Sequence, residues 1–282
     1  HLIGFASLGT LVALFGRFAA PERRGFTVFL CLLCQTATVF VMSLVAWLEL
    51  PMVGQLAILA LLCGTLFYIV TVGDFGPPGA LIFIFAASVS MGQVDTFASV
   101  LERTTATAVA AALAWLVVMI TDVFRHDTPA AQDWFKSRPA SHKLIAVARM
   151  VLGSAVAAYV AYAFGGQHAG WAAMGAVAVL QGSHLHISMS RALQRTIGNV
   201  LGALLVALVL LSQPSVWTII GLVALLSFAT ETIIGSNYGL GQVLVTPMAL
   251  FMSYLAAPDH AGMAMVQERV VDTLIGTAVG IC

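Results

Sequence analysis

The residues of this sequence best suited to bind an anion are two arginines in strongly apolar surroundings. Arg103 and Arg269 each follow a glutamate, and 166 residues separate Glu102-Arg103 from Glu268-Arg269. A guanidinium group can donate two parallel hydrogen bonds to a carboxylate, and a charge inside a bilayer usually pairs or lines a cavity. We therefore predict that both arginines bind a carboxylate and that both glutamates carry protons. The alternative is interfacial placement, with the glutamate favoured by the helix dipole and the arginine extending outward.

Two further carboxylates lie in apolar segments and are predicted to take part in proton coupling. Asp272 lies one helical turn beyond Glu268, and Glu231 lies near the end of an apolar helix. An ionisable residue inside a membrane segment is a candidate for proton transfer. For Glu231, ordinary placement at the level of the lipid headgroups is the alternative.

A proline and several polar residues interrupt the apolar segment at residues 238–257. Pro247 frees a backbone carbonyl and is expected to kink the helix. Broken helices with polar groups form the binding sites of many transporters at mid-membrane, although hydrogen bonding between helices uses the same residue types. The predicted substrate-binding residues of this region are Asn237, Tyr238, Gln242 and Thr246.

An aromatic residue completes the predicted substrate-binding set. Trp171 begins a short apolar segment and could stack on an aromatic ligand, with anchoring at the membrane interface as the alternative. His168, His184 and His186 flank this segment without carboxylate or cysteine companions, so no metal site is predicted. The sequence also lacks metalloprotease, nucleophile-elbow and phosphate-loop motifs. We therefore predict a protein that is not an enzyme and needs no cofactor.

These residues lie in a chain with the composition of a membrane protein. Of its 282 residues, 60% are hydrophobic and 9% are charged, and the mean hydropathy is +0.99. Soluble domains carry about 25% charged residues, and apolar stretches of about 20 residues can cross a bilayer core of about 30 Å. The net charge of zero gives no reason to expect a nucleic-acid partner. We predict an all-α integral membrane protein whose surroundings are the lipid bilayer.

An internal repeat indicates how the membrane segments are organised. Phe5–Gly16 returns as Trp171–Gly182 at the shift of 166 residues that also relates the Glu-Arg pairs. Many transporters consist of two related halves. Because the first segment matches the second segment of the later repeat, one helix is predicted to precede His1, which gives two parallel repeats of six helices. The predicted membrane segments, about eleven in this chain, are roughly residues 2–18, 26–48, 52–73, 77–93, 101–124, 143–164, 169–187, 191–212, 215–234, 238–257 and 265–282.

A polar stretch at residues 125–142 is predicted to link the two halves on the cytoplasmic side. It separates a first repeat at residues 1–124, without its first helix, from a second repeat at residues 143–282. In this orientation ten of the twelve Lys and Arg residues are cytoplasmic, a strong positive-inside bias. The exceptions are Arg103 and Arg269. The predicted location is the bacterial inner membrane, with multiple passes.

Three stretches in the second half resemble the fusaric acid resistance protein family. They are His168–Gly182, Arg191–Gly202 and the segment from Asn237-Tyr238 through Gln242 to Thr246-Pro247. In that family, a short helix opening with Trp leads to a basic loop, then to Arg-x-x-Gly-x-x-x-Gly, and then to an Asn-Tyr helix with Thr-Pro. The family is related to the aromatic acid exporters and to the aluminium-activated malate channels. The first half matches mainly through the internal repeat, and Phe5 stands where Trp is usual.

The resemblance implies an inner-membrane exporter of aromatic carboxylic acids that is driven by the proton gradient. Some relatives work with a periplasmic adaptor protein, and others are passive anion channels. Three hypotheses follow: a proton-coupled exporter of aromatic or other small organic anions, a passive organic-anion channel, and a membrane scaffold that transports nothing. Small-residue motifs also make a homo-oligomer a candidate assembly.

Overall fold

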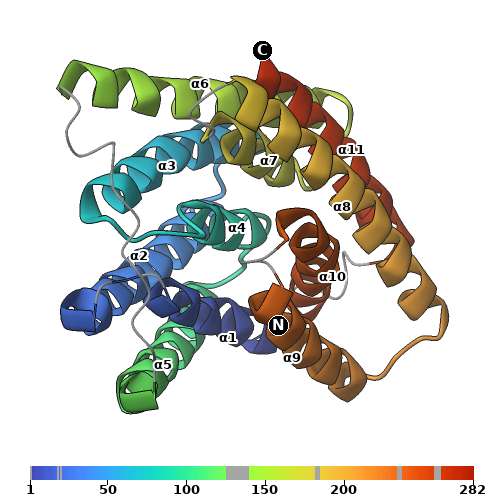
Figure 1. The fold of residues 1–282 in the computed structure, drawn as a ribbon. Coiled ribbons are helices and arrows are strands. Elements are labelled where there is room, and N and C mark those ends of the chain that lie inside the picture. The colour runs from blue at the N-terminus through green and yellow to red at the C-terminus, as the bar shows by residue number, and fades with distance from the viewer. Residues whose placement is uncertain are drawn as a thin grey trace. The chain divides into compact units, whose positions relative to one another are not determined.

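The computed structural model describes residues 2–17, 19, 21–124, 140–181, 185–233, 237–256 and 262–282. In these ranges every regular element is a helix (Figure 1), which confirms the predicted all-α class. The helices follow the predicted apolar segments, although α2 and α8 begin earlier because their polar first turns are also helical. They are α1 (Leu2–Thr10), the 3-10 helix η1 (Leu11–Arg17), α2 (Pro21–Trp47), α3 (Met52–Gly73), α4 (Leu81–Val89), α5 (Phe97–Thr121), the 3-10 helix η2 (Asp122–Phe124), α6 (Ala140–Ala163), α7 (Gly170–Leu180), α8 (Leu185–Leu211), α9 (Val216–Ile233), α10 (Tyr238–Ala256) and α11 (Met263–Ile281).

Seven of the described helices are long and apolar enough to cross a membrane, namely α2, α3, α5, α6, α8, α9 and α10. The remaining helices differ in length or in charge. At 1.5 Å per residue, the 11 residues of α7 extend about 16 Å, about half of a bilayer core, and α1 and α4 have nine residues each. α11 has 19 residues but contains Glu268, Arg269 and Asp272. The total of about eleven spans and the parallel repeat therefore stay predictions.

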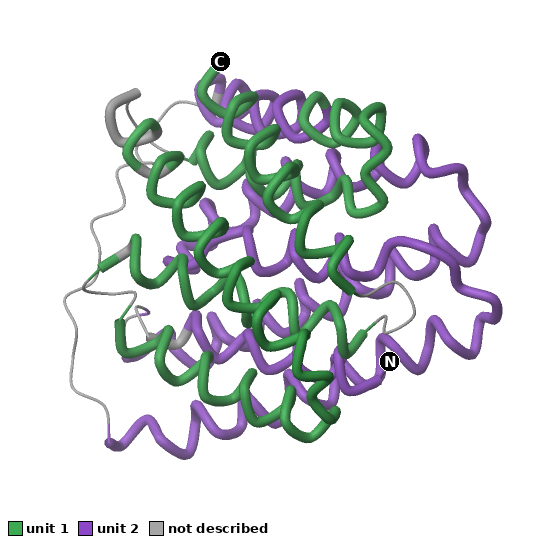
Figure 2. The backbone as a smooth tube through the Cα atoms, turned by 90° about the vertical axis from the view of Figure 1, so that its right-hand side faces the viewer, with its two compact units in different colours: residues 1, 156–282 green, residues 2–155 purple. Residues whose placement is uncertain are grey.

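The described chain divides into two compact units, residues 2–155 and residues 156–282 (Figure 2). The division falls within α6, whose first half packs on α3. A Cβ added to Gly64 of α3 would lie 2.4 Å from Val151 Cγ2, so the absence of a side chain permits this contact. Residues 125–139 of the predicted linker lie outside the described residues, and the predicted limits of the two repeats stay a prediction.

In residues 2–155, close backbone packing joins α1 to α5. A Cβ added to Gly9 would lie 2.3 Å from the carbonyl oxygen of Thr107, so glycine is required where the two helices meet. The core continues into η1, where the ring of Phe15 stacks on that of Phe83 from α4 with 5.1 Å between centroids. Near the change from α1 to η1, Gln35 Nε2 of α2 donates to Leu8 O at 2.9 Å. The sequence repeat that begins at Phe5 thus starts in the short helix α1, which changes to the 3-10 helix η1 after Thr10.

A polar contact holds the beginning of α2 against the end of α5. Arg24 is buried and its Nη1 donates to Asp122 Oδ1, and the side chain of Asp122 is 36% exposed. Seven residues before Asp122, Trp115 Nε1 donates to Gly25 O at 2.9 Å. The guanidinium of Arg24 therefore depends on one partly exposed carboxylate for its charge balance.

We expect Asp122→Asn to lower the unfolding free energy of this unit by about 1–3 kcal/mol, because it leaves a buried guanidinium without its counter-charge. The partial exposure of Asp122 keeps the loss below that of a fully buried pair. Thermal unfolding in detergent measures the effect, with the exposed Glu49→Gln as the matched loss of a carboxylate. Equal melting of the two variants would contradict this account.

In residues 156–282, a pair of glycines brings α8 against α10. A Cβ added to Gly198 would lie 2.6 Å from Gln242 Cβ, and one added to Gly202 would lie 2.7 Å from Thr246 Cβ. Small residues at this four-residue spacing let helices in a membrane approach closely. The polar side chains of α8 and α10 can therefore reach one another directly.

A second glycine pair brings α11 against α7. A Cβ added to Gly276 would lie 2.3 Å from Ala172 O, and one added to Gly280 would lie 2.7 Å from Val179 Cβ. The residues of α7 from Gly170 to Val179 are all buried. α11 packs on α8 as well as on α7 (Figure 1), so it can carry side chains toward both helices.

Candidate anion-binding site

Arg269 lies where α11 crosses the beginning of α7. It is 2% exposed, and its guanidinium carbon lies 5.0 Å from the centroid of the Trp171 ring. A guanidinium over an indole face is attracted by the ring quadrupole. Among the described residues, Arg269 Nε has no hydrogen-bond partner. A buried cation therefore lies beside a buried aromatic ring and keeps an unused donor.

Glu268 holds the loop that precedes α7. One carboxylate oxygen accepts a hydrogen bond from Gln167 N at 2.8 Å, and the other shares a hydrogen bond with His168 Nδ1. The His168 ring also stacks on Trp171, with 4.5 Å between centroids. An acidic side chain near a helix N-terminus is favoured by the helix dipole. Glu268 thereby fixes the position of Trp171 relative to Arg269.

A chain of hydrogen bonds connects α8 to α10 in the same unit. Arg195 Nη1 donates to Gln242 Oε1 at 3.4 Å, Asn199 Nδ2 donates to Arg195 O at 2.9 Å, and Thr246 Oγ1 donates to Asn199 Oδ1 at 2.8 Å. All four side chains are buried. Pro247 follows this chain directly and lies against Gly202, so the predicted interruption of α10 coincides with the network.

Several charged side chains gather where α8 and α11 meet. Arg195 of α8 is buried, and its charge repels that of Arg269. Asp272 of α11 is 2% exposed and interacts electrostatically with Arg269 and Glu268, and its Oδ2 has no hydrogen-bond partner in the described part of the chain. Arg269 interacts with the charge of Arg195 and with that of Asp272, and Glu268 precedes it on the same helix. We call Arg195, Arg269 and Asp272 the buried charge cluster.

The second predicted arginine has a similar neighbour in residues 2–155. The Arg103 guanidinium carbon lies 5.0 Å from the centroid of the Phe5 ring. Its Nη2 donates to Gln93 O at 3.4 Å, and the residue is partly exposed. Glu102 beside it is exposed.

The other predicted residues lie apart from the buried charge cluster or outside the described side chains. Glu231 of α9 is partly exposed. Asn237 is exposed, and its Oδ1 accepts from Leu240 N at 3.0 Å, which satisfies a donor at the start of α10. The side chains of Tyr238 and His186 and the whole of His184 are outside the described residues. Within the described part of the chain, no group of three or more His, Cys, Asp or Glu could hold a metal ion.

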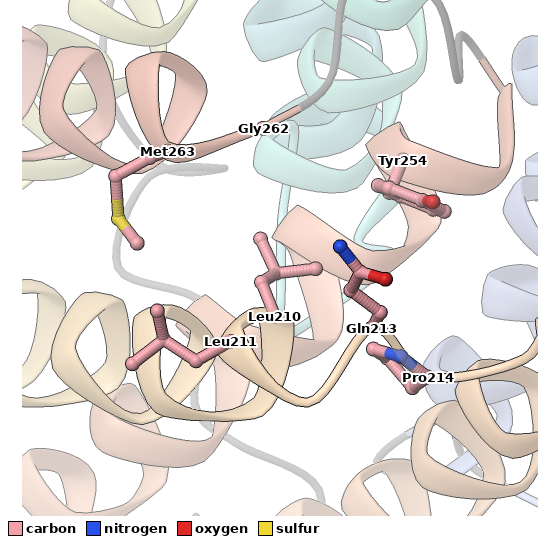
Figure 3. A pocket seen from close by; sticks show the side chains of 7 residues that line it. All are labelled: Leu210, Leu211, Gln213, Pro214, Tyr254, Gly262 and Met263. Atoms are coloured by element: carbon pink, nitrogen blue, oxygen red, sulfur yellow. The ribbon is translucent and has the colours of Figure 1, made fainter.

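A cavity of about 490 Å³ lies among the end of α8, the end of α10 and the beginning of α11. Figure 3 shows the phenol of Tyr254 and the amide of Gln213 on one side and Leu211 and Met263 on the other. The remaining lining residues are Leu210, Pro214 and Gly262. Arg269 lies six residues after Met263, about 9 Å along the helix at 1.5 Å per residue. None of the predicted site residues lines this cavity.

Two members of the network were not assigned to the site from the sequence. Arg195 and Asn199 are on α8, and their sequence signal is the motif Arg195-x-x-Gly198-x-x-x-Gly202. The glycines explain it: they allow α10 to approach, and the arginine and asparagine on the same helix then meet Gln242 and Thr246. Two glycines at four-residue spacing, next to an arginine and an asparagine on the same helix, were the sequence feature that could have indicated this network.

These features define a multi-pass α-helical membrane protein with a buried charge cluster. Residues 156–282 match the family described as fusaric acid resistance protein-like. This match confirms, for the second half of the chain, the family assigned from the sequence, and it covers every residue of the buried charge cluster.

A curated relative gives the same class. The chain is 30% identical over 122 residues to a protein of Bacillus subtilis (strain 168) named "Uncharacterized membrane protein YvaC". The matched stretch is 43% of this chain, and the chain covers 19% of the relative's length. No solved structure matches the chain. What the whole relative does is therefore no guide to the activity of this chain.

Proposed function

We propose that this protein is a secondary transporter of the bacterial inner membrane that exports aromatic or other organic carboxylic acids with proton coupling. The observation that carries the proposal is Arg269, buried over Trp171 with an Nε that has no hydrogen-bond partner among the described residues. A substrate carboxylate would accept a hydrogen bond from this arginine, and the substrate ring would replace the imidazole of His168 against the indole. The carboxylate of an aromatic acid would then contact Arg269 and its ring would contact Trp171, where α7 and α11 cross.

The predicted residues take defined roles in this proposal. Arg269 binds the carboxylate, and Gln242 and Thr246 hold Arg195 in place through the network of α8 and α10. Asp272 and Glu268 are the proton carriers nearest to Arg269, and Glu231 is a further candidate on α9. In two parallel repeats, Arg103 and Phe5 would form the corresponding pair in the first half.

The alternative function is a passive organic-anion channel. The observation that favours it is the engagement of Glu268, whose carboxylate holds the loop before α7. In a channel, the arginines alone would form an electropositive constriction, and no side chain would need to change its protonation. The two functions differ in whether a proton gradient can move the anion uphill.

The proposal is tested by the preference of the protein for aromatic over aliphatic carboxylates of equal charge. Stacking on an aromatic ring contributes about 0.5–1.5 kcal/mol, so Trp171→Ala is expected to lower the flux of benzoate by about three- to tenfold relative to that of acetate. Trp171→Phe should keep most of the preference, since Phe5 occupies the corresponding position beside Arg103. The measurement is paired flux of both anions into liposomes. An unchanged preference in Trp171→Ala would remove Trp171 from the site.

A further inference from the structure

We propose that the organic anion and a proton bind together in residues 156–282, with Asp272 accepting the proton. This inference rests on the proposed function, because it assumes that Arg269 binds the anion. It adds the sign of the coupling: the proton and the anion favour each other's binding and cross the membrane in the same direction.

The position of Asp272 carries the inference. Asp272 and Arg269 are three residues apart on α11, so their side chains share one face of the helix. Both are buried, and Asp272 Oδ2 makes no hydrogen bond to any described residue. A Cβ added to Gly166 would lie 3.5 Å from Asp272 Oδ1, so the backbone of the loop before α7 lies directly beside the carboxylate.

Few other charged groups face Asp272 from the neighbouring helices. Glu268 and Arg269 precede it on α11 and interact with it electrostatically. α7, the first helix packed on α11, has no titratable residue, and His168 in the loop before it is engaged with Glu268. α8, the second such helix, contributes Arg195; the side chain of Arg191 is outside the described residues.

An anion held by Arg269 would lie close to the carboxylate of Asp272. Two negative charges in a buried site repel, and a proton on Asp272 removes that repulsion. Protonation also frees Arg269 from the attraction of Asp272, so both effects strengthen anion binding. Linkage is reciprocal, and bound anion must therefore strengthen proton binding by the same factor. Exchange of a proton for the anion would require the opposite arrangement, in which protonation weakens anion binding.

The charges of the resulting cycle balance. One proton and one monocarboxylate enter the site together, the carboxylate binds Arg269, the proton occupies Asp272, and both leave on the other side. The net movement is that of the neutral acid, so the membrane potential does not drive it. An inward proton gradient therefore opposes export, which runs only where the outward gradient of the anion is the larger.

Binding of benzoate to the full-length protein in detergent tests this inference. Between about pH 8 and about pH 5.5, the wild-type affinity should rise toward about tenfold per pH unit wherever one proton is taken up per anion. Asp272→Asn should bind benzoate with an affinity that does not change with pH. Glu49→Gln, which removes an exposed carboxylate outside residues 156–282, should keep the wild-type slope.

A direct measurement covers the case in which Asp272→Asn fails to fold. Benzoate added to the weakly buffered wild-type protein should remove protons from solution, with a stoichiometry approaching one per anion bound. Proton release, or binding that depends on Arg269 but not on pH, would overturn the inference and leave the proposed site intact. Unchanged benzoate binding by Arg269→Ala would instead overturn the proposed site itself.

Discussion

Replacing Arg269 by alanine is expected to weaken the binding of an aromatic carboxylate by at least about 30-fold, which corresponds to about 2 kcal/mol. The reason is that the anion would lose a buried, charge-assisted partner for which the described part of the chain provides no close substitute on α11. Isothermal titration of the full-length protein with benzoate measures the loss. Arg269→Lys keeps the charge but loses the planar fork and the contact with Trp171, and it should bind with intermediate affinity.

Two controls separate charge from packing. Arg269→Met keeps the long apolar part of the side chain without the charge, so it should melt close to the wild type and still fail to bind. Arg23→Ala removes an exposed arginine of α2 and should bind normally. If Arg269→Met retained wild-type affinity, the buried cation would have no part in anion binding.

The largest effect on stability is expected for Gly276→Ala. The added Cβ would lie 2.3 Å from Ala172 O and 2.9 Å from Gly175 Cα, so the backbones of α7 and α11 would have to separate. Overpacking of a closed contact costs about 1–3 kcal/mol and occasionally more, which exceeds the gain of about 1 kcal/mol in helix propensity from Gly to Ala. The melting temperature in detergent should fall, and benzoate binding should fall with it because Trp171 moves away from Arg269.

Gly221→Ala is the matched control, because nothing lies within 4 Å of a Cβ added to this glycine of α9. It should melt at or above the wild-type temperature through the gain in helix propensity alone. Gly9→Ala should behave like Gly276→Ala, since its Cβ would lie 2.3 Å from Thr107 O. A Gly276→Ala protein as stable as Gly221→Ala would show that the α7–α11 contact can open without loss.

The internal repeat in the sequence is accompanied by two similar arginine–aromatic pairs in the structure, one in each unit. Arg103 over Phe5 and Arg269 over Trp171 have the same distance of 5.0 Å and the same spacing along the chain. Thr107 and Thr273, each one turn later, both donate to the carbonyl of the preceding arginine. The pairs differ in burial, because Arg269 is enclosed while Arg103 is partly exposed. We therefore expect the second half to contribute more to anion binding.

Most of the helical fold could be predicted from the sequence, because apolar periodicity and breaks at proline and glycine define helices locally. The same signals do not by themselves decide which segments span the membrane. α7 is apolar along its whole length, but it has 11 residues and packs against α8 and α11. Hydropathy measures the polarity of a segment and contains no information on what surrounds it.

The candidate site was only partly predictable for a related reason. Arg269 and Glu268 could be found because charged residues are unusual in apolar sequence and these two recur as Arg103 and Glu102. Asp272 could be found as a charge in the same apolar segment, and Trp171 as the first aromatic residue of a short apolar segment. Arg195 was missed because a basic residue near a loop satisfies the positive-inside rule without any further role, and its motif with Gly198 and Gly202 was interpreted as helix packing. Its burial follows from the approach of α10 at Gly198, a contact between helices far apart in the sequence. Asn237 lies exposed at the start of α10, and its part in binding stays a prediction.

The central claim is tested most directly by flux of benzoate in sealed liposomes that contain the full-length protein, with a pH gradient imposed while the membrane voltage is clamped at zero. The account predicts that the pH gradient alone moves benzoate against its own concentration gradient, beyond the movement in protein-free liposomes, and that Arg269→Met abolishes this movement. Benzoate that follows only its own gradient and the voltage, at every imposed pH difference, would contradict proton coupling and identify the protein as a passive anion channel.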